Sequence, residues 1–78
     1  MANIQIYSTP TCVYCRMAKE FLSEHNIAYT DYDVSQNTER RGEMVEKSGQ
    51  MGVPVIDVDG EIIIGFDKAR LIQLLNIK

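Results

Sequence analysis

Hydrophobic residues recur along the chain with two different periods, which predicts both strands and helices. Residues 3–7 alternate, with Ile4 and Ile6 on one side, as in a short strand with one buried face. From Val13 the apolar residues recur every three or four positions, which predicts an amphipathic helix that ends near His25 and Asn26. We expect the apolar face of this helix to be buried; it comprises Val13, Met17, Ala18, Phe21 and Leu22.

The middle of the chain predicts a second strand and a second, weaker helix. The strand covers residues 27–34, and its two aspartates suit a strand with a wet side or a place at the edge of the sheet. A helix follows over residues 39–48, with Ser35 or Asn37 as its N-cap and Gly49 as its terminator. This helix has few sizeable apolar residues and a glycine near its middle, so we expect it to be the weakest of the helices.

The last third of the chain predicts a hairpin and a final helix. A loop over residues 50–52 precedes an apolar run over residues 53–56, and Asp59-Gly60 is typical of a two-residue type I′ turn. Residues 62–64 are three isoleucines and predict a buried strand. After a turn at Gly65-Phe66, Asp67 is the predicted N-cap of a helix that buries Leu71, Ile72 and Leu75.

These elements together predict an α/β fold in the order β-α-β-α-β-β-α. The first two strands are parallel through a right-handed crossover, and the last two form an antiparallel hairpin. The expected architecture is a four-stranded mixed sheet flanked by helices on both faces. At 78 residues, the chain has room for one modest core, so we expect a single domain over residues 1–78.

The two cysteines of the chain are separated by two residues, where the first strand gives way to the first helix. Cys12 and Cys15 fall on one face of the first helical turn, close enough to form a small disulfide ring and open it again. Pro10 breaks the preceding segment and Thr11 is able to cap, which places Cys12 at the helix N-terminus. Free backbone N–H groups and the positive end of the helix dipole favour a thiolate there. Cys12 is therefore the candidate nucleophile.

Composition and charge restrict the possible partners. The formal net charge is −3, and the eight basic residues form no run longer than Arg40-Arg41, which argues against a nucleic-acid partner. The sequence has no apolar stretch of membrane-spanning length, and its N-terminus does not resemble a signal peptide, so we expect a cytoplasmic protein. In a reducing cytosol, a cysteine pair is more plausibly transient or metal-binding than structural.

Three motifs resemble the glutaredoxin family, the small members of the thioredoxin-fold group. They are Cys12 to Cys15 with Tyr14 between them, residues 52–55 (Gly-Val-Pro-Val) before the hairpin, and residues 65–67 (Gly-Phe-Asp) before the last helix. The resemblance covers essentially the whole chain. It implies a thiol–disulfide oxidoreductase in which Cys12 is the exposed nucleophile and Cys15 the resolving thiol. It also implies that Pro54 follows a cis peptide.

The resemblance further implies a glutathione-binding groove, with glutathione as the reductant and no tightly bound cofactor or metal. Tyr14 corresponds to a tyrosine that lines the groove, and Gln50 to a residue that faces the glycine carboxylate. The main chain of Val53, before Pro54, would pair with the main chain of the substrate like an added strand. Asp67 corresponds to an acidic residue that meets the γ-glutamyl amine, and Pro54 and Gly65 complete the expected glutathione contacts. The expected partners are glutathione and proteins that contain disulfides or are glutathionylated, and the expected state is a monomer.

Two alternatives to a glutathione-dependent enzyme stay open. Thr9 stands where family members often have a lysine, Val13 replaces the usual proline between the cysteines, and Gly65-Phe66 resembles the redoxins that serve ribonucleotide reductase and are recharged by thioredoxin reductase. The second alternative is a dimeric carrier of an iron–sulfur cluster or another metal. A zinc site within one chain is disfavoured, because His25 is the one further soft ligand.

Overall fold

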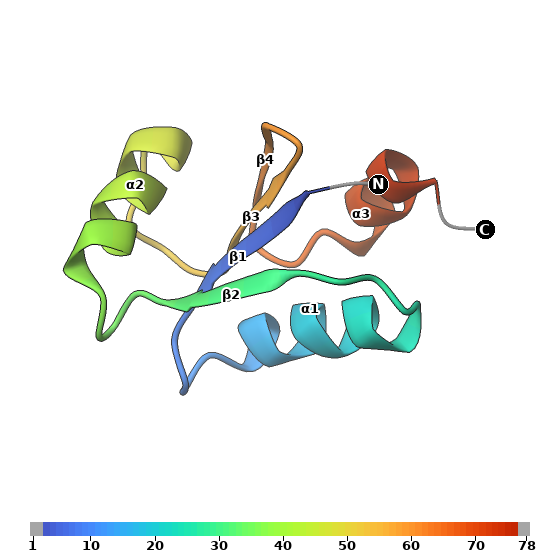
Figure 1. Ribbon diagram of the computed structural model, residues 1–78, viewed down its shortest axis with the longest axis horizontal. Coiled ribbons are helices and arrows are strands. Elements are labelled where there is room, and N and C mark those ends of the chain that lie inside the picture. Colours follow the sequence, from blue (N-terminus) through green and yellow to red (C-terminus); the bar gives the residue numbers. More distant parts are fainter. Residues whose placement is uncertain (1–2, 77–78) are drawn as a thin grey trace.

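The computed structural model describes residues 3–76. Seven elements follow one another in the predicted order (Figure 1). They are β1 (Ile4–Ser8), α1 (Val13–Glu24), β2 (Thr30–Asp33), α2 (Thr38–Ser48), β3 (Val55–Val58), β4 (Glu61–Ile64) and α3 (Lys68–Leu75).

The four strands form one mixed sheet in the spatial order β2-β1-β3-β4. β1 is parallel to β2 and antiparallel to β3, and β3 and β4 form an antiparallel hairpin. Helices α1 and α3 lie on one side of the sheet and α2 on the other (Figure 1). This arrangement confirms the predicted thioredoxin-like fold with helices on both faces.

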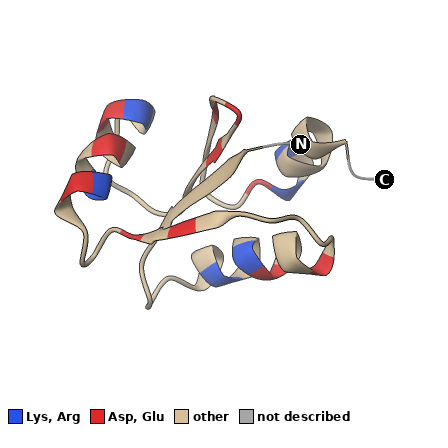
Figure 2. Cartoon of the chain, in the orientation of Figure 1, with Lys and Arg blue, Asp and Glu red and all other residues tan. Residues whose placement is uncertain are grey.

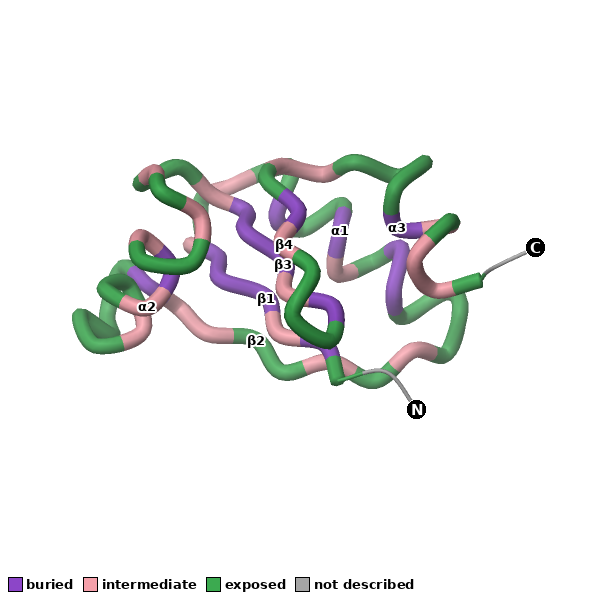
Figure 3. Tube along the Cα trace, turned by 90° about the horizontal axis from the view of Figure 1, so that it is seen from above, coloured by how far each residue is buried: buried purple, intermediate pink, exposed green. Residues whose placement is uncertain are grey.

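The two faces of the sheet carry separate hydrophobic clusters, because side chains alternate along each strand. Toward α1 and α3, the strands place Ile4 and Ile6 from β1 and Ile56 from β3 against the two helices. Toward α2, Tyr7 and Val55 pack with Met44. The buried positions follow the central strands and the inner sides of the helices (Figure 3).

Strand β2 covers Thr30–Asp33, so the predicted strand over residues 27–34 was too long at both ends. The reason lies in its neighbour: β1 has five residues and pairs with β2 from Gln5 opposite Thr30 to Ser8 opposite Asp33. The N–H of Ile27 bonds instead to the carbonyl of Leu22, at the end of α1. β2 is an edge strand, as its aspartates predicted.

Three hydrophobic residues predicted to be buried are exposed. Val13 and Met17 on α1 are 56% and 41% exposed, and Ile64 on β4 is 55% exposed. On α1, Ala18, Phe21 and Leu22 are buried as predicted, but Cys15 takes the inward-facing position in the first turn, which leaves Val13 and Met17 outside the buried face. β4 is the other edge strand, and of its three isoleucines only Ile63 is buried.

The predicted caps and turn beyond the first helix are confirmed. Asn37, one of the two candidates, caps α2 by accepting the N–H of Arg40, and Gly49 ends that helix with φ +73°. Asp59 and Gly60 both have positive φ, 51° and 96°, as a type I′ turn requires.

The basic residues of α1 precede its acidic residues, whereas basic and acidic residues alternate along α2 (Figure 2). Within the described residues, no helix is long and apolar enough to cross a membrane. The partly buried ammonium group of Lys47 on α2 forms an ion pair with Asp57 of β3 at 2.8 Å and donates to the hydroxyl of Tyr7, also at 2.8 Å. Although burial opposes the charge, these two partners raise the pKa of Lys47. This pair joins α2 to the sheet.

Candidate active site

The chain leaves β1 at Ser8 and turns through residues 9–11 into α1, which places Cys12 at the N-cap of the helix. Its backbone is extended, and its Sγ accepts the backbone N–H of Cys15 at 3.1 Å. Thr11 had been expected as the cap, but Cys12 itself takes that place, since its Sγ reaches the N3 amide as a serine oxygen would. The sulfur thus lies at the N-terminal end of α1, where the backbone N–H groups of the first turn have no partner within the helix.

Cys15 lies one helical turn further on and is completely buried. Burial is the main reason that its pKa is raised, to about 12, and the hydrogen bond with Cys12 acts in the same direction. The backbone of Thr9 and the charge of Lys19 offset part of this effect. The two cysteines therefore differ in character: Cys12 is accessible, whereas Cys15 is a buried neutral thiol next to it.

The loop before β3 lies directly beside Cys12. The Cys12 thiol is 3.9 Å from the carbonyl oxygen of Val53. The Val53–Pro54 peptide bond is cis, as expected. After the bond, the carbonyl of Pro54 accepts the N–H of Gly65 at 2.8 Å, so the loop is joined to the end of β4. Segments distant in sequence thus meet around the sulfur of Cys12.

A groove of about 440 Å³ opens at this place. It brings together five of the residues that the resemblance assigned to glutathione: Tyr14, Val53, Pro54, Gly65 and Asp67. The groove is also lined by Ile64, Phe66 and Lys68. Sequence reasoning missed two of these residues: Ile64, whose pattern predicts a buried residue, and Lys68, for which the sequence gives no signal.

Asp67 has two possible roles in this geometry. Its carboxylate accepts the N–H of Arg70 at 3.1 Å and caps α3, as predicted. It is exposed and lines the groove at the same time. Tyr14, which also lines the groove, is 62% exposed, so its ring is available to a ligand.

The glutaredoxin family model matches residues 4–63. The chain belongs to the glutaredoxin family. A glutaredoxin-like protein of 8.6 kDa from the rubredoxin operon of Clostridium pasteurianum is 49% identical over 73 residues, which are 94% of this chain and 97% of that protein. Glutaredoxin 3 of Escherichia coli K12 is 39% identical over 67 residues, covering 86% of this chain and 81% of the relative.

Other similarities fall in neighbouring groups of small redoxins. The glutaredoxin-like protein NrdH of Lactococcus lactis (strain MG1363) is 36% identical over 74 residues, covering 91% of this chain and 97% of the relative. The crystal structure of a point mutant of the thioredoxin-like protein BC3987 superposes with a TM-score of 0.92 at 36% identity and covers all of both chains. The chain is therefore a glutaredoxin-like redox protein.

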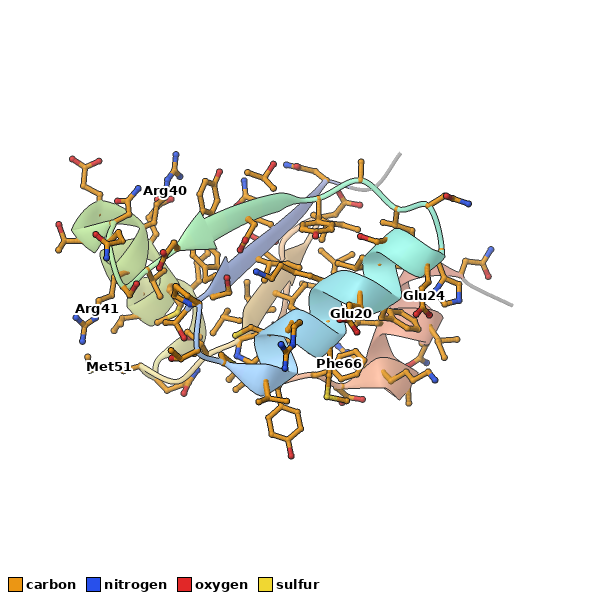
Figure 4. The ribbon with its side chains drawn as sticks, turned by 90° about the horizontal axis from the view of Figure 1, so that it is seen from below. Glu20, Glu24, Arg40, Arg41, Met51 and Phe66 are labelled. Carbon is orange, nitrogen blue, oxygen red and sulfur yellow. The ribbon has the colours of Figure 1, made fainter. Side chains whose placement is uncertain are left out.

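Gln50 is the one predicted glutathione contact of this glutaredoxin that does not line the groove. Its side-chain amide folds back on its own loop, where Nε2 donates to the carbonyl of Gly52 at 3.0 Å and Oε1 accepts the N–H of Gly52 at 2.7 Å. Met51, between them, is 60% exposed and lies in the loop after α2 (Figure 4). The sequence placed Gln50 near the site but did not predict these bonds.

A second hollow, of about 250 Å³, adjoins the groove beside Cys12. Phe66 and Lys68 line both hollows, and Phe66 lies between α1 and α3 (Figure 4). The ring of Phe66 is tilted against that of Phe21, with centroids 5.9 Å apart. Glu20 and Glu24 of α1 lie along the outer side of this hollow (Figure 4).

The contacts of His25 indicate a structural role at the end of α1. Its Nδ1 lies 2.9 Å from the carbonyl oxygen of Phe21, and its ring packs on the Phe21 ring at 4.5 Å between centroids. Among residues 3–76, no three side chains of His, Cys, Asp or Glu gather closely enough to hold a metal ion together.

Proposed function

We propose that this glutaredoxin reduces disulfides through Cys12 and Cys15. The observation that carries the proposal is the asymmetry of the pair: Cys12 Sγ is accessible and accepts an N–H at the N-terminus of α1, whereas Cys15 is fully buried. A nucleophile in thiol–disulfide exchange needs access and a stabilised thiolate, and a resolving thiol needs only to reach the first sulfur.

The reaction proceeds in two exchanges. The Cys12 thiolate attacks one sulfur of the substrate disulfide, forming a mixed disulfide and expelling the other sulfur as a thiolate that takes up a proton. Cys15 then loses its proton and attacks Cys12 Sγ, which releases the second substrate thiol and leaves a Cys12–Cys15 disulfide. Two electrons pass from the dithiol to the substrate, and two thiols of an external reductant restore the dithiol.

Glutathione is the proposed reductant. The groove beside Cys12 offers the tyrosine ring of Tyr14, the main chain of Val53 and the carboxylate of Asp67, at the positions where the family resemblance expects contacts to the tripeptide. Lys68 supplies a positive charge to this groove. In a one-cysteine cycle, glutathione attacks the mixed disulfide in place of Cys15.

Thioredoxin reductase is the second candidate reductant. Phe66 lines the groove next to Gly65, and this pair resembles the redoxins that serve ribonucleotide reductase. The 36% identity to the glutaredoxin-like protein NrdH supports the same interpretation. Thr9 stands where family members often have a lysine, which removes one of the cations that an anionic tripeptide would use.

Cysteine variants test the catalytic assignment. Cys12→Ser should abolish reduction of both protein disulfides and glutathione mixed disulfides. Cys15→Ser should lose reduction of protein disulfides but keep deglutathionylation, because glutathione can release the mixed disulfide on Cys12. A Cys15→Ser protein that is inactive toward glutathione mixed disulfides would count against the glutathione-dependent cycle.

A coupled assay identifies the reductant. NADPH consumption is followed while the protein reduces a glutathione mixed disulfide, in one arm with glutathione and glutathione reductase and in the other with thioredoxin reductase alone. Turnover confined to the first arm supports a glutathione-dependent enzyme. Turnover confined to the second arm would refute it and support the redoxin interpretation.

A further inference from the structure

The loop from Gly49 to Val53 connects α2 to the active site without regular secondary structure, so its backbone groups need other partners. Ser48, the last residue of α2, supplies the first of them. Its Oγ lies 2.6 Å from the carbonyl of Met44 and 3.0 Å from the carbonyl of Gln50, and it accepts the N–H of Gln50 at 3.3 Å. One hydroxyl thus ties the backbone of Gln50 to the end of the helix.

Gln50 repeats this arrangement two residues further along. Its side-chain amide bonds to both backbone groups of Gly52, at 2.7 and 3.0 Å, as a paired peptide group in a sheet would. The fit is close: a Cβ on Gly52 would lie 2.7 Å from the Oε1 of Gln50, which is shorter than real contacts allow. The next residue is Val53, whose carbonyl is 3.9 Å from Cys12 Sγ.

We propose that Gln50 is a positioning residue, which holds Gly52 and thereby orients the main chain of Val53 for pairing with the main chain of a peptide substrate. Ser48 supports it from the end of α2. The inference rests on the proposed function, since it concerns the residue beside Cys12 that would accept the substrate strand. It differs from the family-based expectation, in which the Gln50 side chain would itself contact glutathione.

Substrates with and without a peptide backbone separate the two roles. A peptide dimer joined by a cysteine disulfide needs the Val53 main chain, whereas 2-hydroxyethyl disulfide has no main chain to pair. Pre-reduced protein is mixed with each substrate, and the single-turnover rate is measured against substrate concentration, so that no external reductant is involved. For Gln50→Ala we expect the second-order rate constant with the peptide to fall by about five- to tenfold, because a higher peptide concentration is needed for half-saturation. With 2-hydroxyethyl disulfide we expect the rate constant to change by less than twofold.

Two further variants test the mechanism of positioning. Gly52→Ala should reproduce the Gln50→Ala defect, because the added methyl displaces the amide, and the double variant should be no worse than either single one. Gln73→Ala, an exposed glutamine on α3, is the matched control and should leave both rates unchanged. Thermal unfolding of each variant checks that the fold is retained.

The outcomes distinguish this inference from the proposed function. A peptide rate within twofold of wild type in Gln50→Ala would overturn the inference, as would an equal loss with both substrates. Additive effects of the two substitutions would also overturn it, because they would show that Gln50 and Gly52 act separately. A wild-type protein that reduces neither disulfide would instead refute the proposed function, and the inference with it.

Discussion

The rate of the second exchange should depend steeply on pH, because Cys15 must lose a proton to attack. Burial, with a smaller contribution from the hydrogen bond to Cys12, raises the pKa of Cys15 from 9.0 to about 12. Once Cys12 is in a mixed disulfide its thiol no longer contributes, but burial, the larger cause, remains. Cys15 is therefore almost entirely protonated at neutral pH at the moment when it is needed.

The size of the effect follows from the shift. Near pH 7, a thiol with a pKa of 9.0 is about 1% ionised, and one with a pKa of about 12 is about 0.001% ionised. This loss of thiolate, about 1,000-fold, corresponds to about 4 kcal/mol. The more basic thiolate is also the stronger nucleophile, and a Brønsted coefficient of about 0.45 returns about 20-fold. The net cost is at most about 50-fold, which proximity to Cys12 readily offsets.

Stopped-flow mixing of the reduced protein with excess 5,5′-dithiobis(2-nitrobenzoate) measures this step. Cys12 releases one coloured thiolate in a first phase, and Cys15 releases the second by closing the intramolecular disulfide. The rate of the second phase should be independent of reagent concentration and should rise about tenfold per pH unit between about pH 6 and 8. Cys15→Ser is the control and should show the first phase alone. A second phase that reaches a plateau below about pH 8 would refute a raised pKa for Cys15.

Three further sets of substitutions test the fold by urea denaturation. Lys47→Met removes the ion pair with Asp57 and should lower the free energy of unfolding by about 1–3 kcal/mol below about pH 10. The difference from the wild type should vanish at more alkaline pH, where Lys47 loses its charge. Arg70→Met, the control in an exposed ion pair, should lower the free energy of unfolding by less than about 0.5 kcal/mol. Asp67→Ala should cost about 0.5–2 kcal/mol and Asp67→Asn much less, because an amide oxygen also caps a helix; equal losses would argue against the cap. Gly60→Ala, at φ 96°, should cost about 1 kcal/mol or more, and no loss would argue against the type I′ turn.

The sequence predicted the elements whose causes are local. Asp67 and Asn37 cap helices through bonds to residues three positions away, and Asp59-Gly60 forms its turn from its own backbone preferences. Such signals need only a few neighbouring residues. The length of β2 was not predictable in this way, because β1 determines how many of its residues find a partner.

The part of the site that depends on local sequence motifs was also predictable. The Cys12–Cys15 spacing at a strand–helix junction indicates redox chemistry, and the groove residues came from motifs that resemble a family. The two hydrogen bonds between the Gln50 side chain and the backbone of Gly52 depend on side-chain conformation in an irregular loop, about which hydrophobic periodicity carries no information. The burial of Cys15, which separates the roles of the two thiols, depends on the rotation of α1 against the sheet.

The residues whose burial was wrongly predicted lie near Cys12 in sequence or line the groove and the neighbouring hollow. Val13, Met17 and Ile64 fit the hydrophobic pattern of buried residues, yet the structure leaves them exposed. Val13 adjoins Cys12 in sequence, Ile64 lines the groove, and Met17 lines the neighbouring hollow with Phe66. Apolar side chains left exposed in a groove favour binding, because they have apolar surface still to bury. Departures from the core pattern are expected at functional sites, so the exposure of these residues around the groove and the neighbouring hollow supports the proposed site.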